Sequence, residues 1–378
     1  MPAVFDYLQS YGHKTFTRSA PYNEADAIVF SRFIYLPFKA ISLSDSEIIS
    51  SLGQKFSKVG HSTHFFWDDE KLIHSISKLP RYKDLLVTDF VFRANNKTSE
   101  QFAAATVHLP TNEKLVIYIG TDDTINGWRE DCYMSFMDEV PAQKSAKKYL
   151  KAIAKKYPES HLRICGHSKG GNLSLFAAVT ATDKIVKRIV SVDCLDGPGL
   201  SQKLAEKSRS NPIIKRIKNF IPPNSIAGRL FFHPEKYIVI KSNQEKVQLQ
   251  HNLYSWQINL KTNAFIRSNI SQKSDISDRT ISGWISNATK KQRQAFIDAA
   301  FRGIELSNFD NPADIAAAGT SAFPQLLKSY LSLDKKERKI LLRGFKKLAR
   351  LAISEKRHQK KQIKHQKKAQ TKRSKKGK

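Results

Sequence analysis

The sequence predicts an α/β fold in which a mostly parallel central sheet carries helices on both faces. The main observation is that segments with strand and helix periodicity alternate along the middle of the chain, which is typical of parallel sheets. A second observation is a glycine-flanked serine between a strand pattern and a helix pattern, within residues 162–179. A third is the change to helical patterns alone after Trp256, which predicts a helical C-terminal extension.

The predicted elements begin with a helix over residues 25–34, and helices are expected to fill much of the segment up to Leu86. The apolar segments 102–109 and 115–119 flank a Pro-Thr-Asn turn, and together they predict a β-hairpin. Further strands and helices are expected downstream: a helix at 145–157, strands at 162–165, 185–194 and 237–240, a helix opening at 171–179, and helices at 290–304 and from 322 onward.

Three parts follow from this pattern in a chain of 378 residues with 40% hydrophobic content. Residues 1–260 are expected to form an α/β core that includes the N-terminal helical segment. Residues 261–354 are expected to form a helical C-terminal extension packed on that core. Residues 355–378 contain almost nothing apolar and are expected to form a disordered basic tail.

The net charge of +30 is concentrated at the C-terminal end. From Lys335 onward there are 20 Lys or Arg residues and two acids, so this stretch carries +18 and leaves +12 for the first 334 residues. Such a tail could bind RNA or an anionic membrane surface. The apolar positions of 340–353 alternate with basic residues, so this helix could also lie on lipid by its apolar face.

The cysteines are sparse, at positions 132, 165 and 194, which favours a reducing compartment over a disulfide framework. None has metal-ligand spacing with a histidine, and neither a metal nor a cofactor is expected. The first residues lack the basic and apolar segments of a secretory signal, and no apolar run approaches the ~18 residues of a membrane span. We therefore expect a cytoplasmic protein, which could be peripheral to a membrane; its oligomeric state is left open.

The residues Gly166-His167-Ser168-Lys169-Gly170 form the pattern G-x-S-x-G, a nucleophile elbow. The pattern places a serine on a sharp turn from a strand to a helix, where only small residues fit two positions before and after it. Its flanks have strand and helix patterns in that order. Ser168 is therefore the candidate nucleophile.

A serine needs a histidine to accept its proton, and in α/β-hydrolases the acid and then the histidine follow the serine in the chain. Four histidines follow Ser168, and two of these lie in the basic tail. We favour His251, in a loop after the strand 237–240, over His233, which lies before that strand. A surface histidine beside Trp256 is the alternative interpretation of His251.

The acid is expected to be Asp196, which ends the strand after the elbow helix and precedes Gly197-Pro198-Gly199. Such a turn lies at the carboxyl edge of the sheet, where active-site side chains gather. Asp193 lies three residues earlier and is expected to point into the packing of the strand. The alternative for Asp196 is an aspartate that only bonds its own turn.

The oxyanion hole is expected to use the backbone N–H of Lys169 and that of Thr121, which follows the strand 115–119. The Thr121 hydroxyl could contribute as well. The next residues, from Asp122 to Trp128, are predicted to form a loop on the substrate side. An ordinary connection with Trp128 packed on the body is the alternative.

In combination these residues resemble the Mbeg-like proteins, an uncharacterised family of the α/β-hydrolase superfamily related to class 3 lipases. The resemblance covers about residues 20–260, in matching segments at 25–30 with Tyr35, 120–122 with 127–131, 166–172, 196–199, and 250–251 with 255–256. It implies the α/β-hydrolase fold and a serine nucleophile at Ser168, and it implies no substrate.

Two departures from class 3 lipases stand out. Those lipases have leucine where this chain has Lys169, and their acid usually comes one strand later, near a proline-rich turn. The corresponding segment here, residues 221–226, has no carboxylate. The acid is then Asp196, as in pancreatic-type lipases, or else the site is a dyad or degraded.

The favoured function is an acyl hydrolase of the esterase or lipase type, acting through an acyl-enzyme on Ser168 with an acylated small molecule or lipid as substrate. A hydrolase-fold binding module without chemistry is the second hypothesis. Binding of RNA or an anionic membrane through the tail is the third, and it is compatible with either of the others.

Overall fold

The computed structural model describes residues 1–59, 67–122, 124–307, 309, 314–315 and 318–376. This part of the chain divides into two compact units, the first ending at Ile270 and the second beginning at Ser271. The division falls later than the expected boundary at 260. The other domain boundaries expected from the sequence stay predictions.

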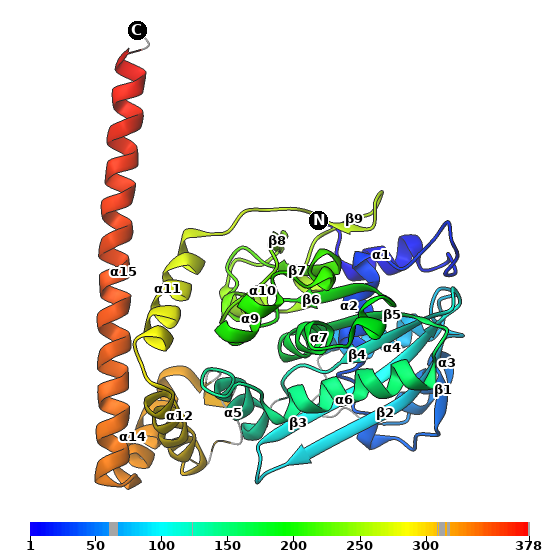
Figure 1. Ribbon diagram of the computed structural model, residues 1–378, viewed down its shortest axis with the longest axis horizontal. Helices are drawn as coiled ribbons and strands as arrows, with labels where there is room; N and C mark the ends of the chain where they lie inside the picture. Colours follow the sequence, from blue (N-terminus) through cyan, green and yellow to red (C-terminus); the bar gives the residue numbers. More distant parts are fainter. Residues whose placement is uncertain (60–66, 123, 308, 310–313, 316–317, 377–378) are drawn as a thin grey trace. The chain divides into compact units, whose positions relative to one another are not determined.

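Within the described residues of the first unit, eight strands form one sheet in which the spatial order equals the chain order (Figure 1). Strands β1 to β4 pair antiparallel, and β4 to β8 pair parallel. The strands are β1 (Ser46–Ile48), β2 (Leu86–Asn95), β3 (Glu100–Leu109), β4 (Glu113–Tyr118), β5 (His161–His167), β6 (Ile189–Leu195), β7 (Ile217–Ile221) and β8 (Tyr237–Val239). The mostly parallel sheet is therefore confirmed.

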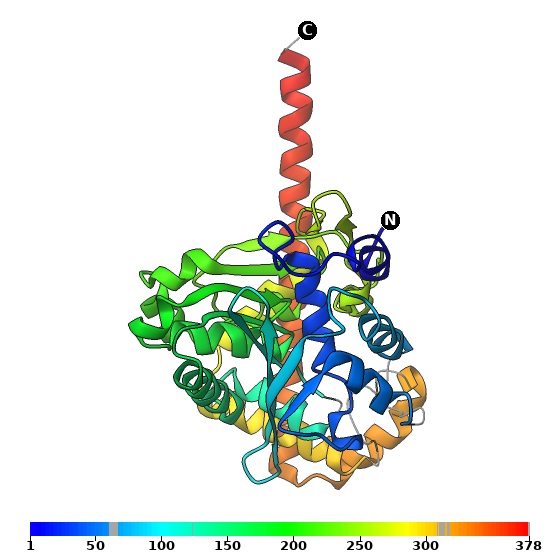
Figure 2. The same ribbon diagram turned by 90° about the vertical axis from the view of Figure 1, so that its right-hand side faces the viewer.

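Helices cover both faces of this sheet, as expected (Figure 2). Along β4, Ile117 packs in the same core as α2 (Glu24–Phe33), and Val116 packs in the core that holds α7 (Lys169–Val179). Neighbouring residues of a strand point to opposite faces, so one apolar strand serves two cores. The other helices of the unit are α1 (Val4–Tyr11), α3 (Ile49–Phe56), α4 (Trp67–Ile76), α5 (Ile125–Tyr133), α6 (Pro141–Lys156), α8 (Asp183–Val186), α9 (Gln202–Ser208) and α10 (Val247–Gln250).

Several expected elements differ in detail from the observed ones. The hairpin is confirmed as β3 and β4, and it turns at Asn112 with a φ of 55°. The expected strand at 185–194 begins only at Ile189, because the residues before it form α8. Three strands of the sheet, β1, β2 and β7, were not expected. A register shift between Thr88 and Val91 interrupts the alternation of β2, which hides the strand in the sequence.

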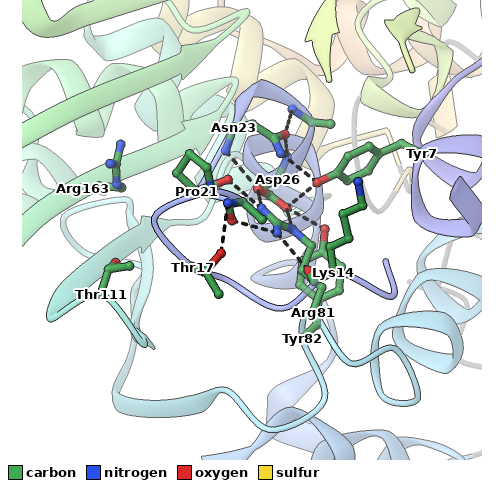
Figure 3. Close-up of polar contacts among 12 residues, drawn as sticks. Tyr7, Lys14, Thr17, Pro21, Asn23, Asp26, Arg81, Tyr82, Thr111 and Arg163 are labelled. Atoms are coloured by element: carbon green, nitrogen blue, oxygen red, sulfur yellow. Dashed lines mark hydrogen bonds and ion pairs between the residues drawn. The ribbon is translucent and has the colours of Figure 1, made fainter. Parts of the chain in front are cut away.

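A buried ion pair fastens the N-terminal helices to the rest of the first unit (Figure 3). Arg81 and Asp26 are joined by two hydrogen bonds of 2.9 and 2.6 Å, and neither side chain is exposed. The hydroxyls of Tyr7 and Tyr82 also donate to Asp26. The remaining donors of Arg81 reach the backbone carbonyls of the segment 14–21. Asp26, in the first turn of α2, therefore ties three segments of the chain together.

The second unit is helical, with α11 (Gln272–Ser286), α12 (Lys290–Glu305), α14 (Phe323–Ser332) and α15 (Lys335–Lys376). Both α11 and α12 pack against α15. The segment expected to be disordered from residue 355 differs in the structure, where α15 continues to Lys376. Its Lys, Arg, Gln and Ala residues have high intrinsic helix propensity, and no glycine or proline interrupts residues 356–376. None of the described helices is long and apolar enough to cross a membrane.

Candidate active site

The site is built around the turn from β5 to α7, where Ser168 has a φ of 56° and a ψ of −125°. A non-glycine residue rarely adopts positive φ, and such strain persists only where the surroundings impose it. Here the Ser168 N–H donates to the Leu195 carbonyl at 2.9 Å, and the Ser168 carbonyl accepts from Gly171 at 2.9 Å. The predicted order of strand, serine and helix is thus confirmed.

The glycines of the motif are required by close backbone contacts. A Cβ on Gly166 would lie 2.4 Å from the backbone of Gly170, and a Cβ on Gly170 would lie 2.3 Å from the Tyr118 carbonyl oxygen. Real Cβ atoms do not approach backbone atoms so closely. Any side chain at either position would push α7 away from the sheet and move Ser168.

His251 and Asp196 form a short hydrogen bond, with 2.6 Å between His251 Nδ1 and Asp196 Oδ2. The other oxygen of Asp196 accepts from the Ser225 hydroxyl at 2.5 Å and from the Gly228 N–H at 3.2 Å. Asp196 is buried, whereas the His251 side chain is 34% exposed. Among the described residues, His251 Nε2 has no partner, so this nitrogen is available to accept a proton.

The proline-rich turn 221–226, which has no carboxylate, contributes to the site in another way. It supplies Ser225, whose hydroxyl holds Asp196. Asp196 itself has a φ of 49° and donates its N–H to Phe220 of β7 at 2.8 Å. The carboxylate is therefore fixed from both the β6 end and the β7 end of the sheet.

Asn172, the last residue of the extended motif, ties the elbow helix to the loop that carries Asp196. Its side-chain N–H groups donate to the carbonyls of Pro198 at 3.2 Å and Gly199 at 2.7 Å. Gln143 of α6 donates to the Asn172 side-chain oxygen at 2.8 Å and so fixes its orientation. This role explains why an asparagine follows the glycines of the elbow.

His167, next to Ser168, brings the His251 loop to the nucleophile. The rings of His167 and His251 have centroids 4.5 Å apart, and His167 Nε2 lies 2.9 Å from the His251 carbonyl oxygen. Burial, together with the neighbouring His251 and Arg32, holds the pKa of His167 well below its usual range. The neutral ring donates from Nε2 and accepts from the Tyr35 hydroxyl, 3.2 Å from Nδ1. Within the described residues, no hydrogen bond joins the Ser168 hydroxyl to the His251 ring, and such contacts are often long without substrate.

A buried network of polar side chains close to His167 was not predicted from the sequence. Arg32 of α2 bonds Asp69 of α4 through two nitrogens, at 2.9 and 2.5 Å, and its guanidinium lies 4.4 Å from the Tyr35 ring. Tyr254, three residues after His251, donates to Asp69 at 2.7 Å. The network links the N-terminal helices to His167 through Tyr35 and to the segment after His251 through Tyr254. No motif spacing could indicate it, since its members come from distant parts of the chain.

The two expected oxyanion donors, the backbone N–H groups of Lys169 and Thr121, have no acceptor among the described residues. The Lys169 side chain is fully buried, and its Nζ lies 3.0 Å from Glu130 Oε2. Glu130 also accepts from the backbone N–H groups of Gln101 at 3.0 Å and Ala142 at 2.7 Å. The lysine that replaces the lipase leucine is thus half of a buried ion pair.

The Thr121 hydroxyl donates to Asp131, the neighbour of Glu130 in α5. Burial raises the pKa of Asp131 to about 6, although the Lys169 charge opposes this rise. Because its proton is engaged, the Thr121 hydroxyl is less suited than the N–H to hold an oxyanion. Both donors therefore belong to segments fastened to α5.

The expected substrate-side loop from Asp122 to Trp128 differs in the structure, because α5 begins at Ile125. The Asp122 carboxylate accepts from the Thr124 N–H at 3.1 Å, and Thr124 caps α5 by accepting from Gly127 at 3.1 Å. Position 123 lies outside the described residues. Trp128 is 39% exposed on the first turns of the helix.

The alternatives to His251 and Asp196 are both engaged elsewhere. His233 is buried, with Nδ1 2.8 Å from Glu235 and 2.9 Å from the Asn219 side chain. Asp193 is 2% exposed and faces Ser191 of its own strand at 3.4 Å. Among the described residues, no group of three or more His, Cys, Asp or Glu could hold a metal ion.

The sheet topology, the serine on its strand-to-helix turn and the order of the candidate residues define an α/β-hydrolase fold. The chain belongs to the Mbeg1-like family, whose model matches residues 76–302, more than half of the 378 residues. The family expected from the sequence is thereby confirmed. A search of curated proteins found no match.

Solved structures similar to this chain include fungal lipases. Lipase II from Rhizopus niveus is 12% identical with a TM-score of 0.38, and the match covers 65% of this chain and 97% of the lipase. Lip2 lipase from Yarrowia lipolytica is 11% identical with a TM-score of 0.36, covering 68% and 97%. A triacylglycerol lipase from Penicillium expansum is 13% identical with a TM-score of 0.31, covering 49% and 80%. At such scores, any argument about chemistry must come from the residues of this chain.

Proposed function

We propose that this protein is a serine hydrolase that cleaves carboxylic esters through an acyl-enzyme on Ser168. The observation that carries the proposal is the hydrogen-bonded pair of His251 and Asp196, with 2.6 Å between Nδ1 and Oδ2. The backbone of His251 is held by His167, the residue that precedes the strained Ser168. A buried carboxylate on one ring nitrogen and no partner on the other is the arrangement a general base requires.

In the proposed reaction, Ser168 Oγ attacks the ester carbonyl carbon while its proton passes to His251 Nε2. Asp196 accepts the hydrogen bond from Nδ1 and stabilises the imidazolium. The N–H groups of Lys169 and Thr121 stabilise the oxyanion of the tetrahedral intermediate. The intermediate collapses, the alcohol leaves with the proton from His251, and an acyl-Ser168 ester remains. A water molecule, deprotonated by His251, then releases the acid and restores the serine.

The lysine after the nucleophile is compatible with this chemistry. Its ammonium is neutralised by Glu130 at 3.0 Å, and both side chains are fully buried. A buried charge with such a partner is held in one geometry, and loss of either partner would leave an uncompensated charge. We therefore assign Lys169 a catalytic contribution through its backbone N–H, with the side chain fastening α5 to the elbow.

The proposed substrate class is acyl esters, including lipids, which a serine nucleophile cleaves through an acyl-enzyme. The test is hydrolysis of p-nitrophenyl esters with acyl chains of increasing length by the full-length protein. We expect release of p-nitrophenol above background for at least one chain length, and background rates for Ser168→Ala, which removes only the attacking oxygen.

If Ser168→Ala hydrolyses the esters as fast as the parent, the proposal is wrong. If neither protein hydrolyses any ester or reacts at the serine, the chain is a hydrolase-fold binding module instead. Circular dichroism of both proteins serves as the control for folding.

A further inference from the structure

The neighbouring helices of the second unit cover only part of the apolar surface of α15. On one side, Leu341 is 5% exposed and packs in a small core with Ala299 and Leu333. Gly344 belongs to the same side, because a Cβ there would lie 2.2 Å from the Phe296 ring. Near the end of this side, Glu355 pairs with Arg279 of α11 at 2.9 Å. This buried side accounts for the packing of α15 on α11 and α12.

Three other large apolar residues of α15 are exposed, although one of them, Phe345, also has its ring edge-on to Phe296 of α12, with centroids 5.3 Å apart. Leu342, Phe345 and Ile353 are 48%, 57% and 51% exposed. At about 100° of rotation per residue, their spacing places all three along one side of the helix, over about three turns. We call these three residues the outer apolar strip. It adjoins the buried side, so the apolar arc is about twice as wide as the packing in the second unit requires.

A row of cations borders the outer apolar strip. Lys339, Lys346 and Arg350 are exposed, and their helical positions follow one edge of the strip. Over its whole length, α15 carries 19 Lys or Arg residues and two acids. An exposed apolar strip with a cationic edge is complementary to a surface that is apolar beneath and anionic above, which is the interface of a bilayer containing acidic lipids.

A second exposed strip, on α14, lacks this complementarity. Phe323, Leu327 and Leu331 are 66%, 44% and 57% exposed, at a spacing of four residues. The only charged residue of that helix is Lys328. The two strips thus have similar apolar content but differ in charge, which makes α14 a matched control for α15.

We infer that the outer apolar strip of α15 docks on an anionic lipid surface, with Leu342, Phe345 and Ile353 in the interface and the lysines and arginines among the headgroups. RNA would use the cations and leave the strip uncovered, so the exposed apolar residues favour lipid. The inference is independent of the ester chemistry. If both hold, α15 brings the hydrolase to lipid substrates.

The test is co-sedimentation of the full-length protein with vesicles of phosphatidylcholine, with and without phosphatidylserine. We expect binding only with phosphatidylserine, and weaker binding as salt rises, since exposed charges are screened beyond about 8–10 Å at moderate ionic strength. The triple variant Leu342→Ser, Phe345→Ser, Ile353→Ser should bind at least about tenfold more weakly, since each change removes apolar area from the interface.

The control variant Phe323→Ser, Leu331→Ser should bind as the parent does. Hydrolysis of a soluble short-chain ester, which needs no lipid surface, should be equal in all three proteins. This readout separates failure of the docking proposal from failure of the proposed chemistry.

Four results would overturn the inference. The parent could bind neutral vesicles as well as anionic ones, or the triple variant could bind as the parent does. The triple variant could convert a dimer to a monomer in sedimentation, which would assign the strip to a second copy. Single-stranded RNA could displace the parent from vesicles while the triple variant binds that RNA equally, which would assign the cations to nucleic acid.

Discussion

Asp193 and Asp196 lie three residues apart at one end of the sheet, yet their surroundings give them different roles. Asp196 receives hydrogen bonds from Ser225, Gly228 and the His251 ring. Asp193 is buried behind the strand, where burial raises its pKa to about 6 in spite of the nearby Lys218 and Arg163. The three hydrogen bonds to Asp196 stabilise its charged form, which is suited to orient a histidine. Asp193 has fewer donors, so burial favours its uncharged form.

The raised pKa of Asp193 makes a prediction about stability and pH. The folded protein holds its proton up to about pH 6, whereas an unfolded aspartate loses it near pH 4. This group therefore supports folding fully below pH 4, and its contribution falls as pH rises through 6. Asp193→Asn should remove that loss. Relative to the parent, its unfolding free energy should rise by up to about 3 kcal/mol between pH 4 and pH 7.5.

Urea unfolding of both proteins at the two pH values measures this difference. Asp84→Asn is the matched control, because Asp84 is 75% exposed and its replacement should give no pH-dependent difference. If the difference in unfolding free energy between Asp193→Asn and the parent is the same at both pH values, Asp193 does not have a raised pKa in the folded protein.

At the residue scale, the sequence predicts the residues that local chemistry requires. Ser168 is indicated by the glycines that its turn demands, and Asp196 and His251 follow from chain order and strand ends. Glu130 and His167 act through contacts across the fold, with Lys169 and with the His251 carbonyl. Such partners could not be predicted, because nothing local in the sequence specifies a distant ion pair.

At the element scale, two of the ion pairs that attach α2 to the rest of the first unit differ in burial. Arg81 and Asp26 are fully buried, whereas Arg267, which pairs with Glu24 at 2.8 Å, is 49% exposed. Arg81→Ala should lower the unfolding free energy by about 3–5 kcal/mol, because it leaves Asp26 buried without its cation. Arg267→Ala should cost less than about 1 kcal/mol, since water replaces an exposed partner.

Urea midpoints of the two variants and the parent check this ranking. Equal losses would mean that the Asp26 network does not hold the N-terminal helices. A loss at Arg81 alone would confirm that burial decides which pair matters.

The elements that the sequence predicts are those with unbroken periodicity. The hairpin, α7 and α12 are regular and were found. The strand β2 was missed because a bulge at Asp89, with a φ of 57°, shifts its alternation. The end of α15 was expected to be disordered because it has no apolar face, an argument that concerns packing and ignores helix propensity.

At the scale of the whole molecule, the division at Ile270 separates the candidate site from the helical unit. All residues of the proposed mechanism, from Thr121 to His251, belong to the first unit. We predict that a fragment ending at Ile270 unfolds cooperatively and hydrolyses soluble esters at the rate of the full chain. Aggregation of the fragment, or loss of its activity, would mean that the second unit completes the fold.

The charge distribution follows the same division, because more than half of the net charge lies in residues 335–378. A site for an uncharged ester needs no such charge. We propose that the basic helix determines where the protein acts and that the elbow carries out its chemistry.

The central claim is that Ser168 is activated, and covalent labelling tests it without assuming a substrate. We predict that a fluorophosphonate probe adds to the peptide containing Ser168 in the full-length protein, as detected by mass spectrometry, and adds nothing to Ser168→Ala. Asp193→Asn should label at the parent rate. Asp196→Asn should label at least roughly 10³-fold more slowly, since His251 loses the carboxylate that orients it. An unlabelled parent, or a Ser168→Ala variant labelled as fast as the parent, would contradict the account.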